Sequence, residues 1–219
     1  MSLNKKVIIF GTGQISQVLY YLINKDTPGR VGGFVVDKKY KNVESLFDLQ
    51  VVDFEDIENF FPIDKFNLLI PLGYNKLNKI RTQKYLEAKK KGYSFSNYIS
   101  PHALVNANQI GENTIIFEYN NIQPFVKIGN NCIIWSGNHI GHHSIIEDNC
   151  FISSHVVISG SVVIKNNSFI GVNASIRDNI VIGKECIIGA GSVILRNVQD
   201  FSILSPGSTE VSKIKSNQL

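Results

Sequence analysis

The sequence contains little cysteine, no long hydrophobic run and no strong excess of either charge. Only three of its 219 residues are cysteine, and the formal net charge is +4. A charge this modest, with the lysines thinly spread, does not indicate nucleic-acid binding. No segment offers the roughly 20 consecutive apolar residues that span a membrane. The opening letters MSLNKK lead straight into an expected strand without a signal peptide or lipidation motif, so we expect a cytoplasmic protein with reduced cysteines.

Charged side chains are unevenly distributed along the chain. Residues 1–100 contain 25 of them, whereas residues 103–198 contain 11. Such a change in composition indicates two physically different modules, followed by a short tail. The boundaries that we predict are 1–100, 101–198 and 199–219.

Residues 104–194 follow a strict period of six. Every sixth residue from Leu104 to Ile194 is isoleucine or leucine, at all sixteen positions. An amphipathic helix needs apolar residues about every 3.6 positions and an ordinary strand about every two, so neither fits. A period of six is typical of a parallel β-helix, in which each hexapeptide forms one short strand and one corner.

The other positions of the hexapeptide support a three-sided coil. Glycine often follows the isoleucine, as a corner without room for a Cβ atom requires. The residue four places after the isoleucine is mostly small or β-branched and is expected to face inward. If three hexapeptides make one turn, residues eighteen apart stack, and one inward ladder consists of Ile128, Ile146, Ile164 and Ile182.

The three cysteines belong to the same pattern. Cys132, Cys150 and Cys186 are separated by 18 and 36 residues, which places all of them in the inward column of small residues. We therefore interpret them as small core residues rather than as redox or metal-binding groups.

The N-terminal segment has the order strand, glycine turn, helix. The apolar run Lys6–Phe10 precedes Gly11–Gly13 and a helical pattern, and a second run, Val31–Val36, ends at Asp37. Such a turn directs backbone N–H groups at a phosphate, and a carboxylate after the second strand can reach a ribose or a base. The turn can also be a simple βα connection, because Ser16 stands where the full motif has its third glycine. The module is only about half of a dinucleotide-binding fold, which argues against a complete NAD-dependent dehydrogenase.

Two further elements are expected before residue 100. Phe66–Pro71 is a third apolar run, and Lys76–Lys91 predicts an amphipathic helix with Ile80, Tyr85 and Leu86 facing inward. A solenoid needs its ends covered, so we expect the N-terminal module to cover one end of the coil and the tail to cover the other.

Four of the five histidines lie within residues 137–155. His142 and His143 follow the corner glycine Gly141, at positions that point outward in the hexapeptide scheme. An imidazole is suited to accepting a proton at neutral pH. Ser144 and Cys150 occupy the inward column instead, which favours direct transfer with a general base over a covalent intermediate.

The histidine spacing does not favour a metal site within one chain. Stacked ligands would be separated by multiples of eighteen, whereas the histidine pairs are 3, 4, 12, 13, 16 and 37 or more residues apart. Ligands contributed by neighbouring subunits stay open as an alternative.

Three groups of motifs carry a resemblance over nearly the whole chain. They are VIIFGTGQISQVL with Asp37 and LIPLGYN, the junction NYISPHALV, and the histidine-bearing coil followed by FIGVNASI and IIGAGSVI. With them the chain resembles the bacterial left-handed β-helix acyltransferases that acetylate nucleotide-activated amino sugars, together with the related sialic acid O-acetyltransferases.

The resemblance implies a homotrimer with active sites in the clefts between adjacent prisms and with acetyl-CoA as cosubstrate. His142 would be the general base, and the N–H of Gly160 would donate to the thioester oxygen. Val172 and Ala190 would contact coenzyme A. The nucleotide-sugar contacts that the resemblance implies are Thr12, Gly13, Gln14, Asp37 and Gly73.

This chain departs from the family pattern at three places. Where members usually have an acidic residue after the base, it has His143, so Glu147 or a group of a neighbouring subunit would replace that acid. Phe151 stands where the family often has a histidine near the coenzyme. The usual Gly-x-Pro-Ala tail motif appears only as Ser205–Ser208.

The expected activity is therefore acetyl-CoA-dependent N-acetylation of a nucleotide-linked deoxyamino sugar. The alternatives are O-acetylation of a sugar of the sialic acid type, a metal-dependent hydratase built on the same coil, and a non-catalytic nucleotide-binding trimer.

Overall fold

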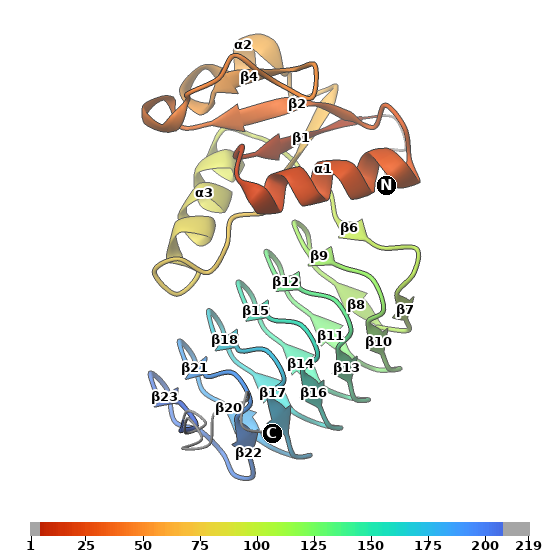
Figure 1. The fold of residues 1–219 in the computed structure, drawn as a ribbon, viewed down its shortest axis with the longest axis vertical. Coiled ribbons are helices and arrows are strands. Elements are labelled where there is room, and N and C mark those ends of the chain that lie inside the picture. Colours follow the sequence, from red (N-terminus) through yellow and green to blue (C-terminus); the bar gives the residue numbers. More distant parts are fainter. Residues whose placement is uncertain (1–4, 208–219) are drawn as a thin grey trace, which may run out of the picture.

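The structure, a computed structural model that describes residues 5–207, consists of an α/β module packed against a three-sided coil (Figure 1). The module contains a five-stranded sheet in the order β3-β4-β2-β1-β5, parallel except where β3 meets β4. Its elements are β1 (Lys6–Phe10), α1 (Gln14–Asp26), β2 (Val31–Val36), β3 (Ser45–Leu46), β4 (Leu49–Asp53), α2 (Ile57–Phe60), β5 (Phe66–Leu69) and α3 (Lys79–Lys90). The strands expected at Lys6–Phe10 and Val31–Val36 are confirmed, whereas β3, β4 and α2 had no prediction.

Helices cover both faces of this sheet. Leu19 and Ile23 of α1 pack on one face, and Tyr85 and Ala88 of α3 pack on the other. The carboxyl ends of the parallel strands meet at one edge, where the loops after β1, β2 and β5 lie. The module therefore has the layered α/β arrangement expected from the sequence.

The expected orientation of the helix at Lys76–Lys91 is partly wrong. The helix begins at Lys79, and Leu86 is 50% exposed rather than inward. Its buried residues are Arg81, Tyr85 and Ala88. The face that carries the charged Arg81 is buried because it packs against the coil as well as against the sheet.

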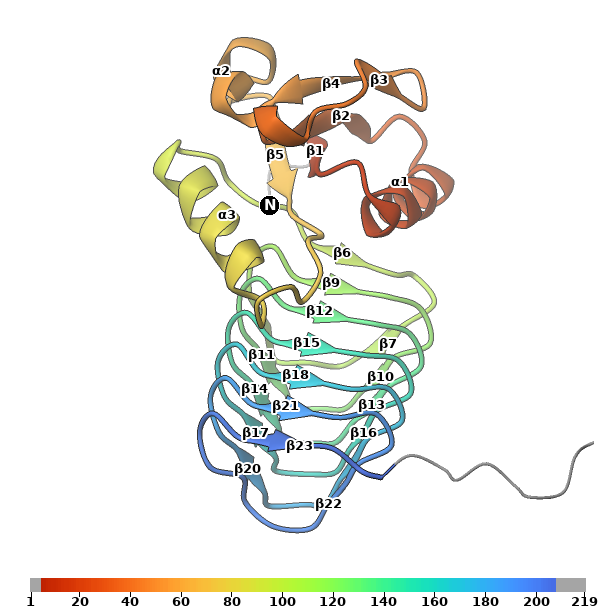
Figure 2. The ribbon, with the colours of Figure 1, turned by 60° about the vertical axis from the view of Figure 1, so that its left-hand side comes forward.

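The coil is a parallel β-helix with three sheets, one on each side of a triangular prism (Figure 2). We name them sheet I, sheet II and sheet III in the order in which the chain visits them. Sheet I holds β6 (Tyr98–Ile99), β9 (Ile115–Ile116), β12 (Ile133–Ile134), β15 (Phe151–Ile152), β18 (Phe169–Ile170), β21 (Ile187–Ile188) and β23 (Ile203–Leu204). Sheet II holds β7 (Leu104–Val105), β10 (Asn121–Ile122), β13 (His139–Ile140), β16 (Val157–Ile158), β19 (Ser175–Ile176) and β22 (Val193–Ile194). Sheet III holds β8 (Gln109–Ile110), β11 (Lys127–Ile128), β14 (Ile145–Ile146), β17 (Val163–Ile164) and β20 (Val181–Ile182).

Residues eighteen apart stack, as the repeat predicts. The ladder of Ile128, Ile146, Ile164 and Ile182 runs through sheet III, and its side chains are buried. One isoleucine-column prediction is wrong: Leu104 is 62% exposed. Its neighbour Val105 pairs with the buried Ile122 instead. The spacing from Val105 to Ile110 is one residue shorter than the repeat, which turns Leu104 to the outer face.

The inward column of small residues also follows the prediction. Cys132, Cys150 and Cys186 are free thiols with fully buried side chains. Burial raises the pKa of the Cys150 and Cys186 thiols, because an apolar surrounding disfavours the thiolate.

The corners of the prism repeat one backbone geometry. The third residue after the inward isoleucine is left-handed, with φ between +52° and +77° at every corner from residue 113 to residue 191. Asparagine occupies this position most often: Asn113, Asn131, Asn149, Asn167, Asn173 and Asn179. The glycine directly after the isoleucine has a different purpose. A Cβ atom at Gly141 would lie 2.6 Å from the backbone N of Gly160. The close approach of the next coil, rather than a left-handed turn, requires glycine there.

The N-terminal module packs against the side of the coil, which corrects the expectation that it covers an end. Ile115, Ile133 and Phe151 point outward from sheet I, yet all are buried in a cluster that includes Leu19 and Ile23 of α1. Figure 2 shows the module above the first coils, with α3 and the loop before it reaching down along the prism. The outer face of sheet I is therefore an interdomain core.

Arg81 joins the two parts of the chain. Its buried guanidinium donates to the carbonyl oxygens of Leu72 and Gly73 on the module, at 3.0 and 3.2 Å. It also donates to those of Asn131 and Asn149 on the coil, at 3.1 and 2.9 Å. Burial lowers the pKa of Arg81 to about 10, so the side chain stays charged at neutral pH.

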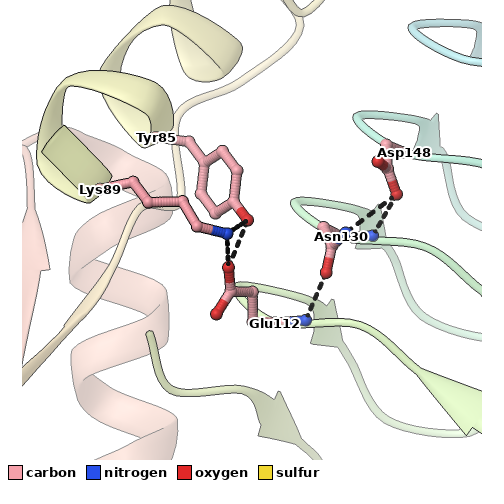
Figure 3. A network of polar contacts seen from close by, with 5 residues as sticks. All are labelled: Tyr85, Lys89, Glu112, Asn130 and Asp148. Carbon is pink, nitrogen blue, oxygen red and sulfur yellow. Dashed lines mark hydrogen bonds and ion pairs between the residues drawn. The ribbon is translucent and has the colours of Figure 1, made fainter. Parts of the chain in front are cut away.

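A polar network lies where α3 meets the corner between sheets III and I (Figure 3). The hydroxyl of Tyr85 donates to the carboxylate of Glu112 at 2.5 Å, and Lys89 pairs with the same oxygen at 2.6 Å. Along the corner, the N–H of Glu112 donates to Asn130 (3.0 Å), and the N–H of Asn130 donates to Asp148 (2.7 Å). Each coil thus caps a backbone N–H group of the preceding one.

The first and last strands of sheet I lie outside residues 101–198. β6 pairs with β9, so sheet I begins at Tyr98, and β23 pairs with β21 beyond residue 198. The predicted tail from residue 208 onward, including Ser208 of the tail motif, lies outside the described residues. Within residues 5–207, no helix is both long enough and apolar enough to cross a membrane.

Candidate active site

His142 lies at the II–III corner, between β13 and β14. Its side chain is exposed on the outside of the prism, and its backbone N–H donates to Oε1 of Gln123 at 2.9 Å. Ser144 and Cys150 are buried inside, as their column predicts. The corner therefore offers an imidazole to solvent and keeps the hydroxyl of Ser144 inside the prism.

His143 is in direct contact with His142. The two Nδ1 atoms are 3.1 Å apart, within hydrogen-bond distance. His143 occupies the left-handed corner position with φ +62°, and its ring packs on Phe125 with 4.6 Å between centroids. The backbone turn and this aromatic contact hold the second imidazole beside the first.

Gly160 lies one coil further along the same corner, against the His142 ring. A Cβ atom at Gly160 would be 2.7, 2.9 and 3.2 Å from three imidazole atoms, so only glycine allows this approach. The N–H of Gly160 has no hydrogen-bond acceptor within residues 5–207, whereas its carbonyl accepts the N–H of Asn179. A donor beside an imidazole is the arrangement that can stabilise a developing oxyanion.

Val172 and Ala190 lie at a different corner, between sheets I and II. Both are exposed, and they stack in successive coils, with the N–H of Gly191 donating to the carbonyl of Val172 at 2.8 Å. Sheet II separates this corner from His142 in the same chain. One protomer therefore does not bring the predicted coenzyme contacts and the predicted base together.

The carboxyl edge of the N-terminal sheet forms a pocket of about 340 Å³. Gly13, Gln14 and Gly73 line it, together with Tyr74 and Asn75. Helix α1 begins at Gln14, and Gly13 in the N-cap position has no side chain to cap it, so the pocket lies at the uncapped N–H groups of the first helical turn.

Gly11 and Ser16 determine the shape of the turn at this pocket. Gly11 has φ +92°, a conformation that favours glycine, and the buried Ser16 donates to the carbonyl of Phe10 at 3.1 Å. Ser16 thus braces the turn at the position of the missing third glycine.

Thr12 and Asp37 are not among the residues that line the pocket. The carbonyl of Thr12 accepts a hydrogen bond from Gln17 at 2.9 Å. Asp37 ends β2 as expected, but its carboxylate is buried and lies 2.6 Å from the ammonium group of Lys84 on α3.

Glu147 and Phe151 do not lie where a role beside His142 or coenzyme A would need them in one protomer. Glu147 is at the III–I corner, where its carboxylate accepts the N–H of Asn166 at 3.0 Å. Phe151 is 3% exposed, because Tyr74 and Phe169 cover its ring at centroid distances of 5.1 and 5.7 Å. The packing of the module on sheet I makes Phe151 an interdomain core residue, whereas its place in the family pattern implied a residue near the coenzyme.

Three residues that shape these sites were not identified from the sequence. Gln123 holds the His142 backbone, Arg81 holds the loop at Gly73, and Tyr74 joins the pocket to the coil. Of these three, only Gln123 could have been found from the sequence, because it lies eighteen residues before Gly141 and therefore stacks on the corner that carries His142. No set of three His, Cys, Asp or Glu side chains in the described part of the chain is grouped closely enough to hold a metal ion.

Comparisons with known proteins define the class of fold. The model for the bacterial transferase hexapeptide (six repeats) matches residues 109–141, 126–160 and 161–196. No curated protein sequence matches the chain.

Solved structures extend the similarity to nearly the whole chain. A histidine-to-asparagine mutant of perosamine N-acetyltransferase from Caulobacter crescentus, in complex with CoA and GDP-perosamine, has 22% identity and a TM-score of 0.81, covering 92% of this chain and 93% of that one. The acetyltransferase domain of PglB from Neisseria gonorrhoeae, in complex with acetyl coenzyme A, has 23% identity and a TM-score of 0.81, with coverage of 93% and 97%. WeeI from Acinetobacter baumannii has 17% identity and a TM-score of 0.78, with the same coverage.

The chain is thus an α/β module followed by a left-handed parallel β-helix, the fold of acetyltransferases that bind coenzyme A. Its segment 109–196 is made of bacterial transferase hexapeptide repeats.

Proposed function

We propose that the protein transfers the acetyl group of acetyl-CoA to the amino group of a nucleotide-linked amino sugar. The observation that carries the proposal is the II–III corner, where the exposed His142 lies over the glycine backbone at Gly160 and a free N–H. The same fold in an acetyltransferase with CoA and GDP-perosamine bound supports this substrate class.

The reaction uses these groups in one direct transfer. The amine nitrogen attacks the thioester carbonyl, a C–N bond forms and the C–S bond breaks. His142 accepts the proton that the amine loses and returns it to the leaving coenzyme A thiolate. The N–H of Gly160 donates to the carbonyl oxygen while it carries negative charge. General-base assistance of this kind contributes about 10²- to 10⁴-fold to the rate.

The complete site needs two copies of the chain. Val172 and Ala190 lie at the I–II corner and His142 at the II–III corner, so the cosubstrate would meet the base only where the I–II corner of one protomer faces the II–III corner of another. A homotrimer with three such clefts satisfies this requirement by rotational symmetry. At the I–II corner, the exposed side chains of Val172 and Ala190 stack in successive coils and would contact acetyl-CoA.

The nucleotide would bind at the N-terminal pocket. The uncapped first turn of α1 after Gly13 suits a diphosphate, Gln14 and Gly73 line the pocket, and Thr12 would contact the ligand from the same turn. Asp37 would contact the ribose or the base after a rearrangement of its ion pair with Lys84.

The test is a coenzyme-release assay on purified protein with acetyl-CoA and a panel of nucleotide-linked sugars, in matched amino and hydroxy versions. We expect thiol release with the amino sugars. Release with the hydroxy sugars alone would replace the proposal by O-acetylation, and binding of sugar nucleotides without any release would indicate a binding module. Analytical ultracentrifugation should give the mass of a trimer.

A further inference from the structure

We infer that His143 is the positioning residue of the base, in the place where an acid would be expected. The inference rests on the proposed function and concerns the same corner. Its geometric support is the 3.1 Å distance between Nδ1 of His142 and Nδ1 of His143. Nδ1 is the atom of His142 whose hydrogen bond determines which ring nitrogen is free to accept a proton.

The contact can contain only one hydrogen, because two nitrogens face each other. When His142 donates and a neutral His143 accepts, the lone pair of His142 is on Nε2 and the ring can act as a base. When His143 donates instead, Nε2 of His142 carries the hydrogen and cannot accept another. The reaction therefore uses the first arrangement, in which His143 selects the reactive tautomer of His142.

Within one protomer, the adjacent coils present no charged side chain at this corner that could position the His142 ring in place of His143. The coil before the corner presents Gln123, Pro124 and Phe125, and the coil after it presents Gly160 and Ser161, none of which is charged. The carboxylate of Glu147 is engaged at another corner. The two imidazoles are thus the titratable groups of this corner across three coils.

A neutral partner has a consequence that a carboxylate would not have. His143 loses its acceptor lone pair when it is protonated, and two adjacent cations repel each other. Productive turnover by this arrangement therefore requires both rings to be unprotonated. We expect the acid limb of log(kcat/KM) against pH to approach a slope of two at its lowest pH.

The left-handed backbone at residue 143 provides variants that do not disturb the fold. Glycine occupies the equivalent corner position at Gly137 and Gly191, asparagine occupies it at six corners, and glutamate occupies it at Glu185. His143→Gly, His143→Asn and His143→Glu should all keep the thermal midpoint of the parent. His155→Asn, at another left-handed corner, serves as the backbone control for stability.

The three variants separate the positioning role from packing. His143→Gly should lower kcat about 10-fold with both KM values unchanged, because the tautomer of His142 is no longer selected. His143→Asn keeps a neutral acceptor that does not titrate, so kcat should be retained while the acid-limb slope falls to one. His143→Glu should move the acid limb to higher pH, since a carboxylate stabilises the protonated base.

The result that overturns the inference is an unchanged kcat and pH profile in His143→Gly. Parallel measurement of His142→Ala separates this failure from that of the proposed function. An inactive His142→Ala with a fully active His143→Gly would reject the role of His143 alone, whereas an active His142→Ala would reject the base itself.

Discussion

The II–III corner and the III–I corner share one backbone design and differ in what the side chains do with it. His143 and Asn131 are both left-handed, at φ +62° and +56°. At the III–I corner, Asn130 and Asp148 cap the N–H groups of the preceding coils, and α3 covers the corner (Figure 3). At the II–III corner, Gly160 has no side chain, and its N–H has no acceptor among residues 5–207. The repeat supplies the scaffold at both corners, and the interruption of the capping ladder leaves the donor that the proposed mechanism uses.

We expect substitutions at the II–III corner to lower activity with little change in stability. Substitutions at the III–I corner should lower stability with little change in activity.

The largest effect is expected for His142→Ala. Loss of the base should lower kcat by about 10²- to 10⁴-fold. Alanine fits because Ala190 occupies the equivalent repeat position, so the thermal midpoint should be retained. Coenzyme release under saturating substrates measures the change, and full activity would remove the proposed mechanism.

Gly160→Ala tests the free donor. The new Cβ atom would lie 2.7 Å from the His142 ring and would force ring and backbone apart. We expect kcat to fall by about 10²-fold, the size associated with losing one oxyanion donor. Ala190→Gly, which removes the same methyl group at the I–II corner, controls for the effect of the substitution on coil stability. A fall in stability without a fall in kcat would contradict the assignment.

Arg81→Met tests the attachment of the module at the III–I corner. The substitution leaves buried carbonyl groups of Leu72, Asn131 and Asn149 without their donor. We expect the free energy of unfolding to fall by about 3 kcal/mol, because each buried acceptor loses its partner. Urea unfolding followed by circular dichroism measures this. An unchanged unfolding midpoint would show that the apolar core on sheet I holds the module without Arg81.

Asp148→Ala tests one step of the capping ladder. It removes the acceptor of the N–H of Asn130. A charge-assisted bond of this kind contributes about 1–2 kcal/mol, so the unfolding free energy should fall by that amount while kcat stays the same. A loss of activity with unchanged stability would contradict the division between the two corners.

The smallest effect concerns the pH dependence of Glu112. Burial alone would raise the pKa of this carboxyl, but the bonds from Lys89 and Tyr85 outweigh burial and hold its pKa below the usual value. Its contribution to stability is therefore complete above the unfolded-state pKa and is lost as pH falls through the lower folded-state pKa. Solvent screening keeps the contribution below about 1 kcal/mol. Acid unfolding of Glu112→Gln should lack this part of the pH dependence.

The coil was predictable from the sequence because a single period determines strands, stacking and inward residues together. Leu104 is the exception, since a shortened first coil changes the register without breaking the apolar pattern. The outward direction of His142 followed from its position in the six-residue repeat, and the stacking of Gly160 beside it followed from the eighteen-residue turn. The contact between His142 and His143 did not, because hexapeptide spacing gives no ring orientation.

The docking of the N-terminal module was not predictable for a different reason. Sheet I is apolar on its outer face as well as its inner face, but adjacent isoleucines fit the repeat equally well whether or not a domain covers them. Arg81 lies among lysines in the sequence and resembles a solvated helix residue. Only the carbonyl oxygens of two separate coils, brought together by stacking, give it buried partners. Long-range geometry of this kind leaves no local signal.

The inward cysteine column has a practical consequence. Cys132, Cys150 and Cys186 are sealed inside the prism, and the raised pKa of Cys150 and Cys186 keeps these two as unreactive thiols. An aromatic disulfide reagent added to the native enzyme will therefore report the coenzyme product without a background from the polypeptide. When no substrate is present, a slow colour change with the same reagent will report exposure of the cysteines as the coil unfolds.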